Sequence, residues 1–330
     1  MSSLNVFQDD AFSLTSLTAA IQNVPYKPAR ISAASLYEEQ GIVGLDFYIE
    51  IADGVLELIP VSQRGAPAQP AGKGARIAKS FRVAHVKQND ALLADQIMGV
   101  RAFGSETEVE TMARLVGQRL ATMANNIRYT LESHRLLGLK GLLVDALGNQ
   151  VDLYNEFDVE KKVVPFALNS ADTKVRGKCL QVLEHIEDGL GGLSFTGVEV
   201  LCGKNFWADL IDHKAVADTY LNTQQAAELR GDGRNSFEFG GLNFERYRGT
   251  SAVKVEDDEA IAFPVGVQSM FLTRYAAADW IETVNTLGQP LYAKQWEMEA
   301  GRGINLEAQA SPINLNTRPG AVIRLKRGAI

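Results

Sequence analysis

One long segment of the chain spaces its apolar residues as a helix does. Ser105-Glu-Thr-Glu108 follows Gly104 and matches a capping box, in which the serine and the glutamate satisfy each other's free backbone amides. The residues that then recur three, four or seven positions apart are Val109, Met112, Val116, Leu120, Met123, Ile127, Leu131 and His134. Gly138 is the expected stop. The pattern predicts one amphipathic helix from Ser105 to Leu137.

This helix is long for a chain of 330 residues. About 33 residues at 1.5 Å each give roughly 50 Å, and a compact globule of this size is about 50 Å across. The face opposite the apolar stripe is predicted to be polar and carries Arg114, Gln118, Asn125, Arg128 and Arg135. We therefore expect an elongated or plate-like protein that buries further surface against partners.

Apolar and polar residues alternate on both sides of a stretch rich in glycine, proline and alanine. Phe47, Ile49 and Ile51 alternate with polar neighbours before it, and Phe81 and Val83 do so after it. The stretch itself, residues 63–76, cannot form a core of its own. The pattern predicts a hairpin with a flexible tip, and because an isolated hairpin is marginally stable, it should lie on its own globule or on another subunit.

The rest of the chain mixes helix and strand patterns. The first 40 residues resemble an arm whose short helix, near Phe12 to Ile21, is stopped by Pro25 and Pro28. Further helices are predicted at 171–190 and 205–221, and strands at 142–145, 150–154, 197–202, 236–247, 260–265, 291–298 and 321–325. The sequence therefore predicts an α+β fold.

The net charge of −7 argues against a nucleic-acid-binding protein, which needs a concentrated basic face. Its distribution is uneven, however, because residues 62–87 contain six Lys or Arg and no acidic residue. A basic segment on an acidic protein can dock on copies of that protein. A solvated loop is the alternative interpretation.

Motifs for catalysis, metals or membranes are missing. Gly72-Lys73-Gly74 lacks the earlier glycine of a phosphate-binding loop, since position 67 is proline. The four histidines have no metal-ligand spacing, and no serine stands in a Gly-x-Ser-x-Gly turn. No run of about 18 apolar residues is present. We expect no catalytic residue, no cofactor, no metal and no membrane contact.

The cysteines and the start of the sequence bear on where the protein is made. Cys179 and Cys202 lie far apart among apolar neighbours, which favours reduced thiols in a core. Residues 1–10 lack the basic and apolar regions of a secretory signal. Cytoplasmic synthesis is therefore expected.

Several short motifs, in this order and spacing, resemble a known family along nearly the whole chain. They are residues 12–21 with Pro25 and Pro28, Arg64-Gly65, Gly99-Val-Arg-Ala-Phe-Gly104, Thr130-Leu-Glu132, Leu139-Lys-Gly141, Asp145-Ala-Leu-Gly148, Asn205-Phe-Trp207, Ser311-Pro312 and Arg318-Pro319. The chain resembles the lambda-type major capsid protein family (capsid protein E) of tailed bacteriophages.

The resemblance implies the Hong Kong 97 phage capsid fold. Its parts would be an N-terminal arm (1–44), an E-loop hairpin (45–88), a P-domain (89–154) with a spine helix (105–137), an A-domain (155–285) and a return to the P-domain (286–330). At the E-loop tip, Arg64, Lys73, Arg76, Lys79 and Arg82 would contact an adjacent subunit.

The resemblance also implies a function. The protein would be the major capsid protein of a virion, made in the host cytoplasm, whose copies form hexamers and pentamers of an icosahedral shell. Portal and scaffold proteins, and a decoration protein, are candidate partners. The shell would enclose DNA without sequence-specific binding, which the acidic balance suits. An encapsulin-like compartment shell and an unrelated soluble enzyme are the alternatives.

The predicted spine helix has weak helix formers in its middle. Gly117 costs about 1 kcal/mol relative to alanine, and Asn125 and Asn126 follow one after the other. One hypothesis is that the helix bends there between an immature and an expanded shell. The other is that Gly117 only allows close packing.

Overall fold

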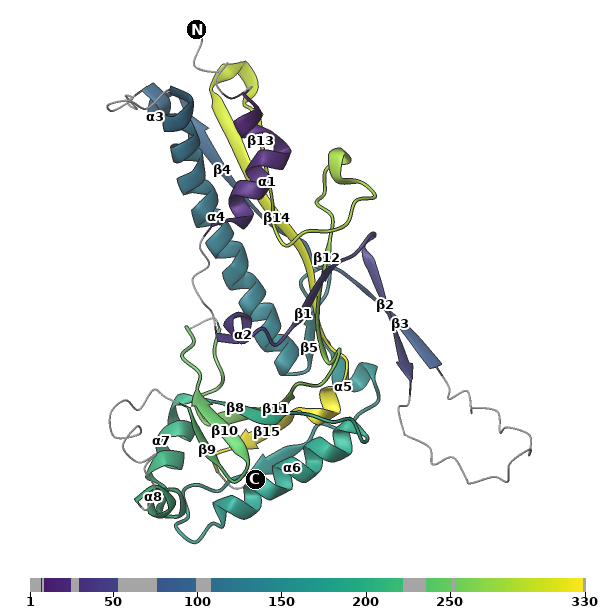
Figure 1. Cartoon of the computed structure of the whole chain (residues 1–330), viewed down its shortest axis with the longest axis vertical. Helices are drawn as coiled ribbons and strands as arrows, with labels where there is room; N and C mark the ends of the chain where they lie inside the picture. The colour runs from purple at the N-terminus through teal and green to yellow at the C-terminus, as the bar shows by residue number, and fades with distance from the viewer. Residues whose placement is uncertain are drawn as a thin grey trace, which may run out of the picture.

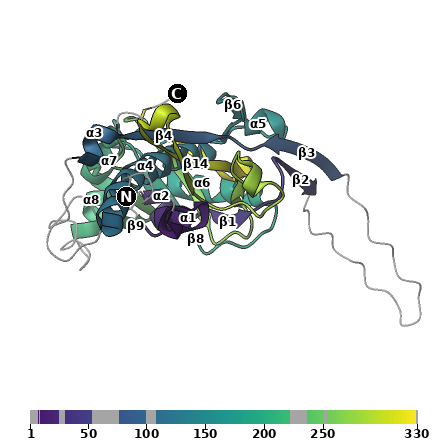
Figure 2. The ribbon, with the colours of Figure 1, turned by 90° about the horizontal axis from the view of Figure 1, so that it is seen from above.

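The computed structural model describes residues 7, 9–24, 30–52, 76–98, 108–221, 236–250 and 253–328. The molecule is elongated, and a long helix runs beside a long strand towards a second layered region (Figure 1). A hairpin projects from the side of this body (Figure 2). The mixed helix and sheet content confirms the α+β prediction.

The helices within these residues have the following bounds. They are α1 (Leu14–Gln22), α2 (Arg30–Ala33), α3 (Ala94–Met98), α4 (Glu108–Leu139), α5 (Leu153–Glu156), α6 (Val175–Leu190), α7 (Lys204–Asp212) and α8 (Lys214–Leu221). Four short 3-10 turns are η2 (Asp10–Phe12), η3 (Ile281–Thr283), η4 (Glu299–Gly301) and η5 (Pro319–Ala321).

The strands form two larger sheets and two hairpins. The five-stranded sheet holds β1 (Glu38–Gly41), β12 (Phe271–Ala276), β14 (Gly303–Asn316), β13 (Tyr292–Glu297) and β4 (Val86–Leu93). The six-stranded sheet has the order β7 (Val163–Pro165), β15 (Ile323–Lys326), β11 (Glu259–Val265), β8 (Gly197–Cys202), β10 (Leu242–Arg246) and β9 (Phe237–Phe239). The hairpins are β2 (Asp46–Ala52) with β3 (Arg76–Arg82), and β5 (Leu142–Val144) with β6 (Gln150–Asp152).

Strand β14 organises the five-stranded sheet. Residues 303–310 pair with β4, residues 304–309 also pair with β13, and residues 311–316 pair with β12. The sequence analysis did not predict β14, β12 or β4. Burial explains the omission of β12 alone, because all six of its residues are buried and no alternation marks it. Strand β14 does alternate, with Ile304, Leu306 and Ala308 between polar residues, and the sequence analysis missed this pattern. Strand β4 is largely polar and only partly buried, so no apolar pattern marks it.

Helix α4 packs its apolar stripe against β14, β4 and α1. The described part of the predicted stripe is buried, at 6% exposure or less for Met112, Val116, Leu120, Met123, Ile127 and Leu131. Each such side chain contributes about 1.5–3 kcal/mol when it is fully buried. The apolar stripe predicted from the sequence is therefore confirmed over these turns.

The end of the helix differs from the prediction. α4 continues to Leu139, and Gly138 lies inside it. The glycine with a left-handed backbone conformation is Gly141, with φ +75°, just after the helix ends. Gly138 instead leaves room for Tyr37, whose hydroxyl would lie 2.5 Å from a Cβ at this position. Arg135, predicted on the polar face, is 4% exposed, because α2 and β1 cover that face near the end of α4.

The other predicted ranges mostly coincide with observed elements, whereas β1, β7, α2, α3 and α5 were not predicted. The helix predicted at 205–221 is two helices, because His213 is extended and its Nδ1 accepts the backbone N–H of Ala215. The strand predicted at 150–154 ends at Asp152, whose carboxylate accepts the N–H of Tyr154 and starts α5. The predicted helix 171–190 begins at Val175.

The two sheets do not change over at the domain boundary expected between residues 285 and 286. Strand β12, before that limit, pairs with β14 in the five-stranded sheet. Strand β15, after it, pairs with β11 and β7 in the six-stranded sheet. The chain therefore crosses between the two sheets both before β12 and after β14.

Replacing Gly138 by Ala should destabilise the subunit by about 1–3 kcal/mol, because the new methyl group meets the Tyr37 hydroxyl. Gly117→Ala is the matched control in the same helix. A Cβ there meets no described atom within 4 Å, so helix propensity should stabilise it by up to about 1 kcal/mol. Urea unfolding of the unassembled subunit measures both. Equal stability of the two variants would contradict this packing.

Candidate assembly site

The hairpin of β2 and β3 is the part of the structure that extends farthest from its own body (Figure 2). The two strands are antiparallel and in register from Asp46 opposite Arg82 to Ala52 opposite Arg76. At its base, Phe81 and Val83 are buried in a small core with Ile313 and Leu315 of β14. The base is thus fixed to the five-stranded sheet.

The five predicted contact residues of this hairpin are placed as follows. Arg64 and Lys73 lie outside the described residues, and Arg76 is described by its backbone, which pairs with Ala52. Lys79 forms an ion pair of 2.9 Å with Glu156 of α5 in the same chain. Arg82 is exposed at the base. Of the described members, Lys79 is therefore held within its own subunit.

The five predicted positions of the spine helix are also placed in part. Ser105 lies outside the described residues, and Glu108 is the first residue of α4. Asn125 is half-buried, and Asn126 donates from Nδ2 to Oε1 of Gln88 on β4 at 3.1 Å. The open space at Gly117 gives the close-packing hypothesis no support within the subunit. Bending at this point stays a prediction.

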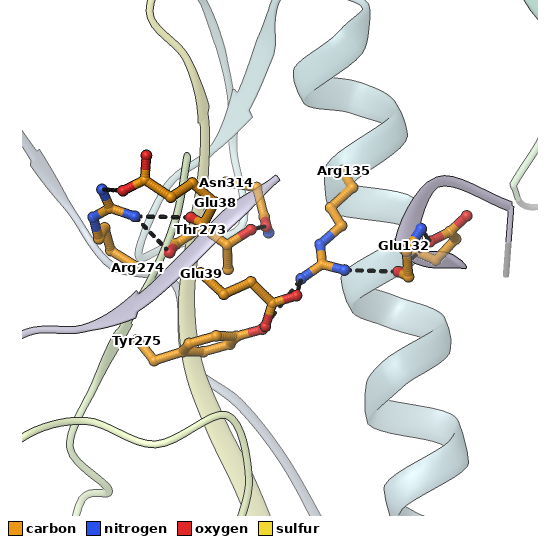
Figure 3. A network of polar contacts seen from close by, with 9 residues as sticks. Glu38, Glu39, Glu132, Arg135, Thr273, Arg274, Tyr275 and Asn314 are labelled. Carbon is orange, nitrogen blue, oxygen red and sulfur yellow. Dashed lines mark hydrogen bonds and ion pairs between the residues drawn. The ribbon is translucent and has the colours of Figure 1, made fainter. Parts of the chain in front are cut away.

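A polar network, buried except for Glu39, joins α4 to the N-terminal segment and to the five-stranded sheet (Figure 3). Arg135 donates from Nη2 to Oε1 of Glu39 at 2.6 Å and to the hydroxyl of Tyr275 at 3.2 Å. The Tyr275 hydroxyl in turn donates to Oε2 of Glu39 at 2.9 Å. The Tyr37 hydroxyl donates to the carbonyl oxygen of Arg135 at 2.7 Å. The last turns of α4 are thereby bound to β1 and β12.

Electrostatics in this network keep its hydrogen-bond roles fixed. Burial opposes the charge of Arg135, but the neighbouring Tyr275 and Glu39 outweigh it and raise the pKa of the guanidinium. Burial also raises the pKa of Tyr37 and of Tyr275 above the ordinary value for tyrosine. The arginine therefore stays charged, and both hydroxyls stay protonated donors.

A second group of contacts in Figure 3 fixes β1 to the sheet. Arg274 donates to the carbonyl and to the carboxylate of Glu38, both at 2.8 Å. Beside it, the Thr273 hydroxyl donates to Oδ1 of Asn314 at 2.7 Å. Thr273 and Asn314 are both buried, so this hydrogen bond joins β12 and β14 away from water.

An apolar surface surrounds the base of the hairpin and the loop between β12 and β13. Ile281 is 91% exposed, and Val43, Leu45, Val284 and Leu287 are also exposed. Leu45, Ile281 and Val284 line a cleft of about 590 Å³ together with Arg82 and Trp280. Contiguous exposed apolar residues of this kind are typical of surfaces that bind protein. The sequence analysis missed this surface, because its residues come from segments more than 200 positions apart.

The described residues offer no evident reaction centre. No group of three or more His, Cys, Asp or Glu among them is placed to hold a metal ion. Cys179 and Cys202 are free and buried, as predicted, and burial raises the pKa of Cys179 to about 12. No helix within the described ranges is long and apolar enough to cross a membrane.

The family model for phage major capsid protein E matches residues 13–327, nearly the whole chain. The chain belongs to this family. It is 27% identical to the major capsid protein of Salmonella phage Felix O1, over 96% of this chain and 97% of that protein. It is 26% identical to the major capsid protein of Pseudomonas phage KPP10, again over 96% and 97% of the two chains. The resemblance inferred from the short motifs is confirmed.

Solved capsid structures have the same fold. The mature capsid protein of bacteriophage PhiM1 matches with a TM-score of 0.51 and 14% identity, over 88% of this chain and 84% of that one. The capsid protein of an empty GTA particle matches with a TM-score of 0.53 and 9% identity, over 92% of each chain. At these identities the likeness concerns the fold alone, and the fold is that of Hong Kong 97-like phage capsids.

Proposed function

We propose that copies of this capsid protein assemble into hexamers and pentamers of a closed icosahedral shell that encloses the phage genome. The observation that carries the proposal is the projecting hairpin of β2 and β3, in a chain that matches the capsid family from residue 13 to 327. A two-stranded ribbon is only marginally stable in water by itself, so contact with a neighbouring subunit would stabilise the part that projects beyond its own core. Rings of such heterologous contacts can close into a shell.

The parts of the fold take the following roles in this proposal. Residues 45–88 form the E-loop, α4 is the spine of the P-domain, and the six-stranded sheet is the centre of the A-domain. The residues before 45 form an arm, with α1 on β13 and α4 and with α2 at the junction. In the same proposal, residues 89–154 belong to the P-domain, residues 155–285 to the A-domain, and residues 286–330 return to the P-domain. The pairing of β12 with β14 and of β15 with β11 supports assigning β12 to the P-domain and β15 to the A-domain.

The role in this proposal is structural and not catalytic. Membership of a family of capsid proteins supports it. Synthesis in the host cytoplasm, the enclosure of DNA without sequence-specific binding, and contacts with portal, scaffold or decoration proteins belong to the same proposal. The acidic balance of 40 Asp and Glu against 33 Lys and Arg suits an interior that does not adhere to DNA.

Purified protein should form uniform closed shells of several hundred ångströms in negative-stain electron microscopy, with a matching fast species in sedimentation. The full chain is examined over a range of salt and protein concentrations, because charged contacts depend on ionic strength. Monomers or small oligomers under all these conditions would contradict the proposal. A shell that takes up one protein through a short cargo peptide would favour the encapsulin-like alternative.

The basic tip of the hairpin is predicted to contact a neighbouring subunit. Changing Arg64, Lys73 and Arg76 together to Glu should raise the protein concentration needed for assembly by about ten-fold or more, because like charges would then face the acidic neighbour. The control changes the exposed Lys174, Lys204 and Lys214 to Glu and alters the net charge equally. Light scattering during assembly measures both. Assembly of the tip variant at the wild-type concentration would contradict the contact.

Bending of α4 near Gly117 and the Asn125-Asn126 pair is predicted to accompany expansion of the shell. Gly117→Ala should shift the balance between the immature and the expanded shell towards the one with the straighter helix, because alanine favours a regular helix by about 1 kcal/mol per subunit. Particle diameter and helix shape before and after expansion, determined by cryo-electron microscopy, measure the effect. Normal expansion with an unbent helix in both states would exclude the bend.

A further inference from the structure

The short helix α2 lies at the junction between α4 and the six-stranded sheet (Figure 1). It contains four residues, Arg30 to Ala33, too few to be stable by themselves. Two neighbouring parts of the molecule hold it in place, one through residues 31 and 32 and the other through Arg30.

On one side, α2 is bound to the last turns of α4. The carboxylate of Glu132 accepts the backbone N–H groups of Ile31 at 2.8 Å and of Ser32 at 3.1 Å. It also accepts the Ser32 hydroxyl at 2.6 Å, and Arg135 donates from Nη1 to the same hydroxyl oxygen at 2.7 Å. Glu132 is 2% exposed, so its charge depends on these donors in place of water.

On the other side, Arg30 is bound to the six-stranded sheet. Its Nε donates to both carboxylate oxygens of Glu245 on β10, at 2.7 and 2.6 Å. Its Nη2 lies 2.6 Å from Glu245 and 3.3 Å from Glu199 on the neighbouring strand β8. All three side chains are about one third exposed or less. One guanidinium thus bridges two carboxylates of the sheet.

The two sets of contacts are separated by a single peptide bond. The end of α4 also has polar contacts with the loop between β10 and β11, from Tyr129 to Thr250 and from Lys140 to the carbonyl of Lys254 at 3.1 Å and to Glu256 at 3.6 Å. Among these contacts, only Arg30 reaches the strands of the sheet itself with a forked ion pair.

Leu136 and Leu139 of α4 pack in the same core cluster as the six-stranded sheet and Ile31. Apolar contacts set a distance but are not directional. Hydrogen bonds and forked ion pairs are directional, so α2 can fix the angle at this junction.

We propose that residues Arg30 to Ser32 form a strap that sets the angle between the six-stranded sheet and helix α4. When Arg30 loses its partners, the sheet pivots on Leu136 and Leu139. Because the strap is part of the N-terminal segment, the position of that segment also affects the angle. The same four-residue helix contacts the six-stranded sheet and α4. In a shell, the angle between these two parts contributes to curvature, and this second statement rests on the proposed function.

The strap is tested in the unassembled subunit by the distance between spin labels at Gln118→Cys on α4 and Asp188→Cys on α6. Both positions are exposed, while the native Cys179 and Cys202 are buried and should not react. Arg30→Leu should widen the distance distribution about two-fold, because relative domain motion is the default where an interface is weak. Arg30→Lys keeps the charge without the fork and should give an intermediate width.

Arg119→Leu is the matched control. It removes an ion pair of 3.3 Å with Asp90 that joins α4 to β4, away from the junction, and that is similarly exposed. Its distribution should keep the wild-type width, even if both variants lose equal stability in urea. Equal widths for Arg30→Leu and Arg119→Leu would overturn the strap.

The link to curvature has its own measurement. Shells of Arg30→Leu should show a wider spread of diameters than shells of wild type or of Arg119→Leu. If Arg30→Leu widens the distribution of label distances but its shells keep the single diameter of the wild type, the role in curvature is overturned. The strap itself would still be supported. Absence of shells from the wild-type protein would instead contradict the proposed function, while the label distances would still decide on the strap.

Discussion

A carboxylate and a guanidinium lie buried on the last turns of the longest helix, and the fold must satisfy both. Glu132 is 2% exposed and Arg135 4% exposed. Leaving either without partners would cost several kcal/mol. Their partners come from α2, from Glu39 on β1 and from Tyr275 on β12. Satisfying them therefore holds the N-terminal segment, the five-stranded sheet and the helix in one arrangement.

This arrangement leaves other surfaces free for a neighbour. Strand β14 is paired on both sides along residues 304–309, and α4 covers one face of its sheet, so the inner body is complete within one chain. The hairpin of β2 and β3 projects from that body (Figure 2), and the apolar side chains around Ile281 are exposed on its surface. A self-contained body with a projecting ribbon and an exposed apolar surface is the expected shape of a subunit that is completed by its neighbours.

Local patterns in the sequence predicted the amphipathic parts of this fold well. The stripe from Met112 to Leu131 and the hairpin strands have a clear period, because each buries one face. Strand β12 is buried along its whole length and carries no period, so it was missed. Strand β14 alternates from Ile304 to Ser311, so its omission was an error of the sequence analysis. Arg135 was predicted on the polar face because it lies opposite the apolar stripe of the helix. In the structure, residues about 100 positions earlier cover it. The strap and the apolar surface likewise depend on contacts between distant segments, which no local pattern contains.

The central claim is that this capsid protein binds its neighbours in a shell through the projecting hairpin and the exposed apolar surface. A cryo-electron microscopy reconstruction of assembled particles tests it most directly. We expect the hairpin of β2 and β3 to lie on an adjacent subunit, and the surface of Leu45, Ile281 and Val284 to be covered there. A shell in which the hairpin folds back on its own subunit and this surface stays in solvent would contradict the account.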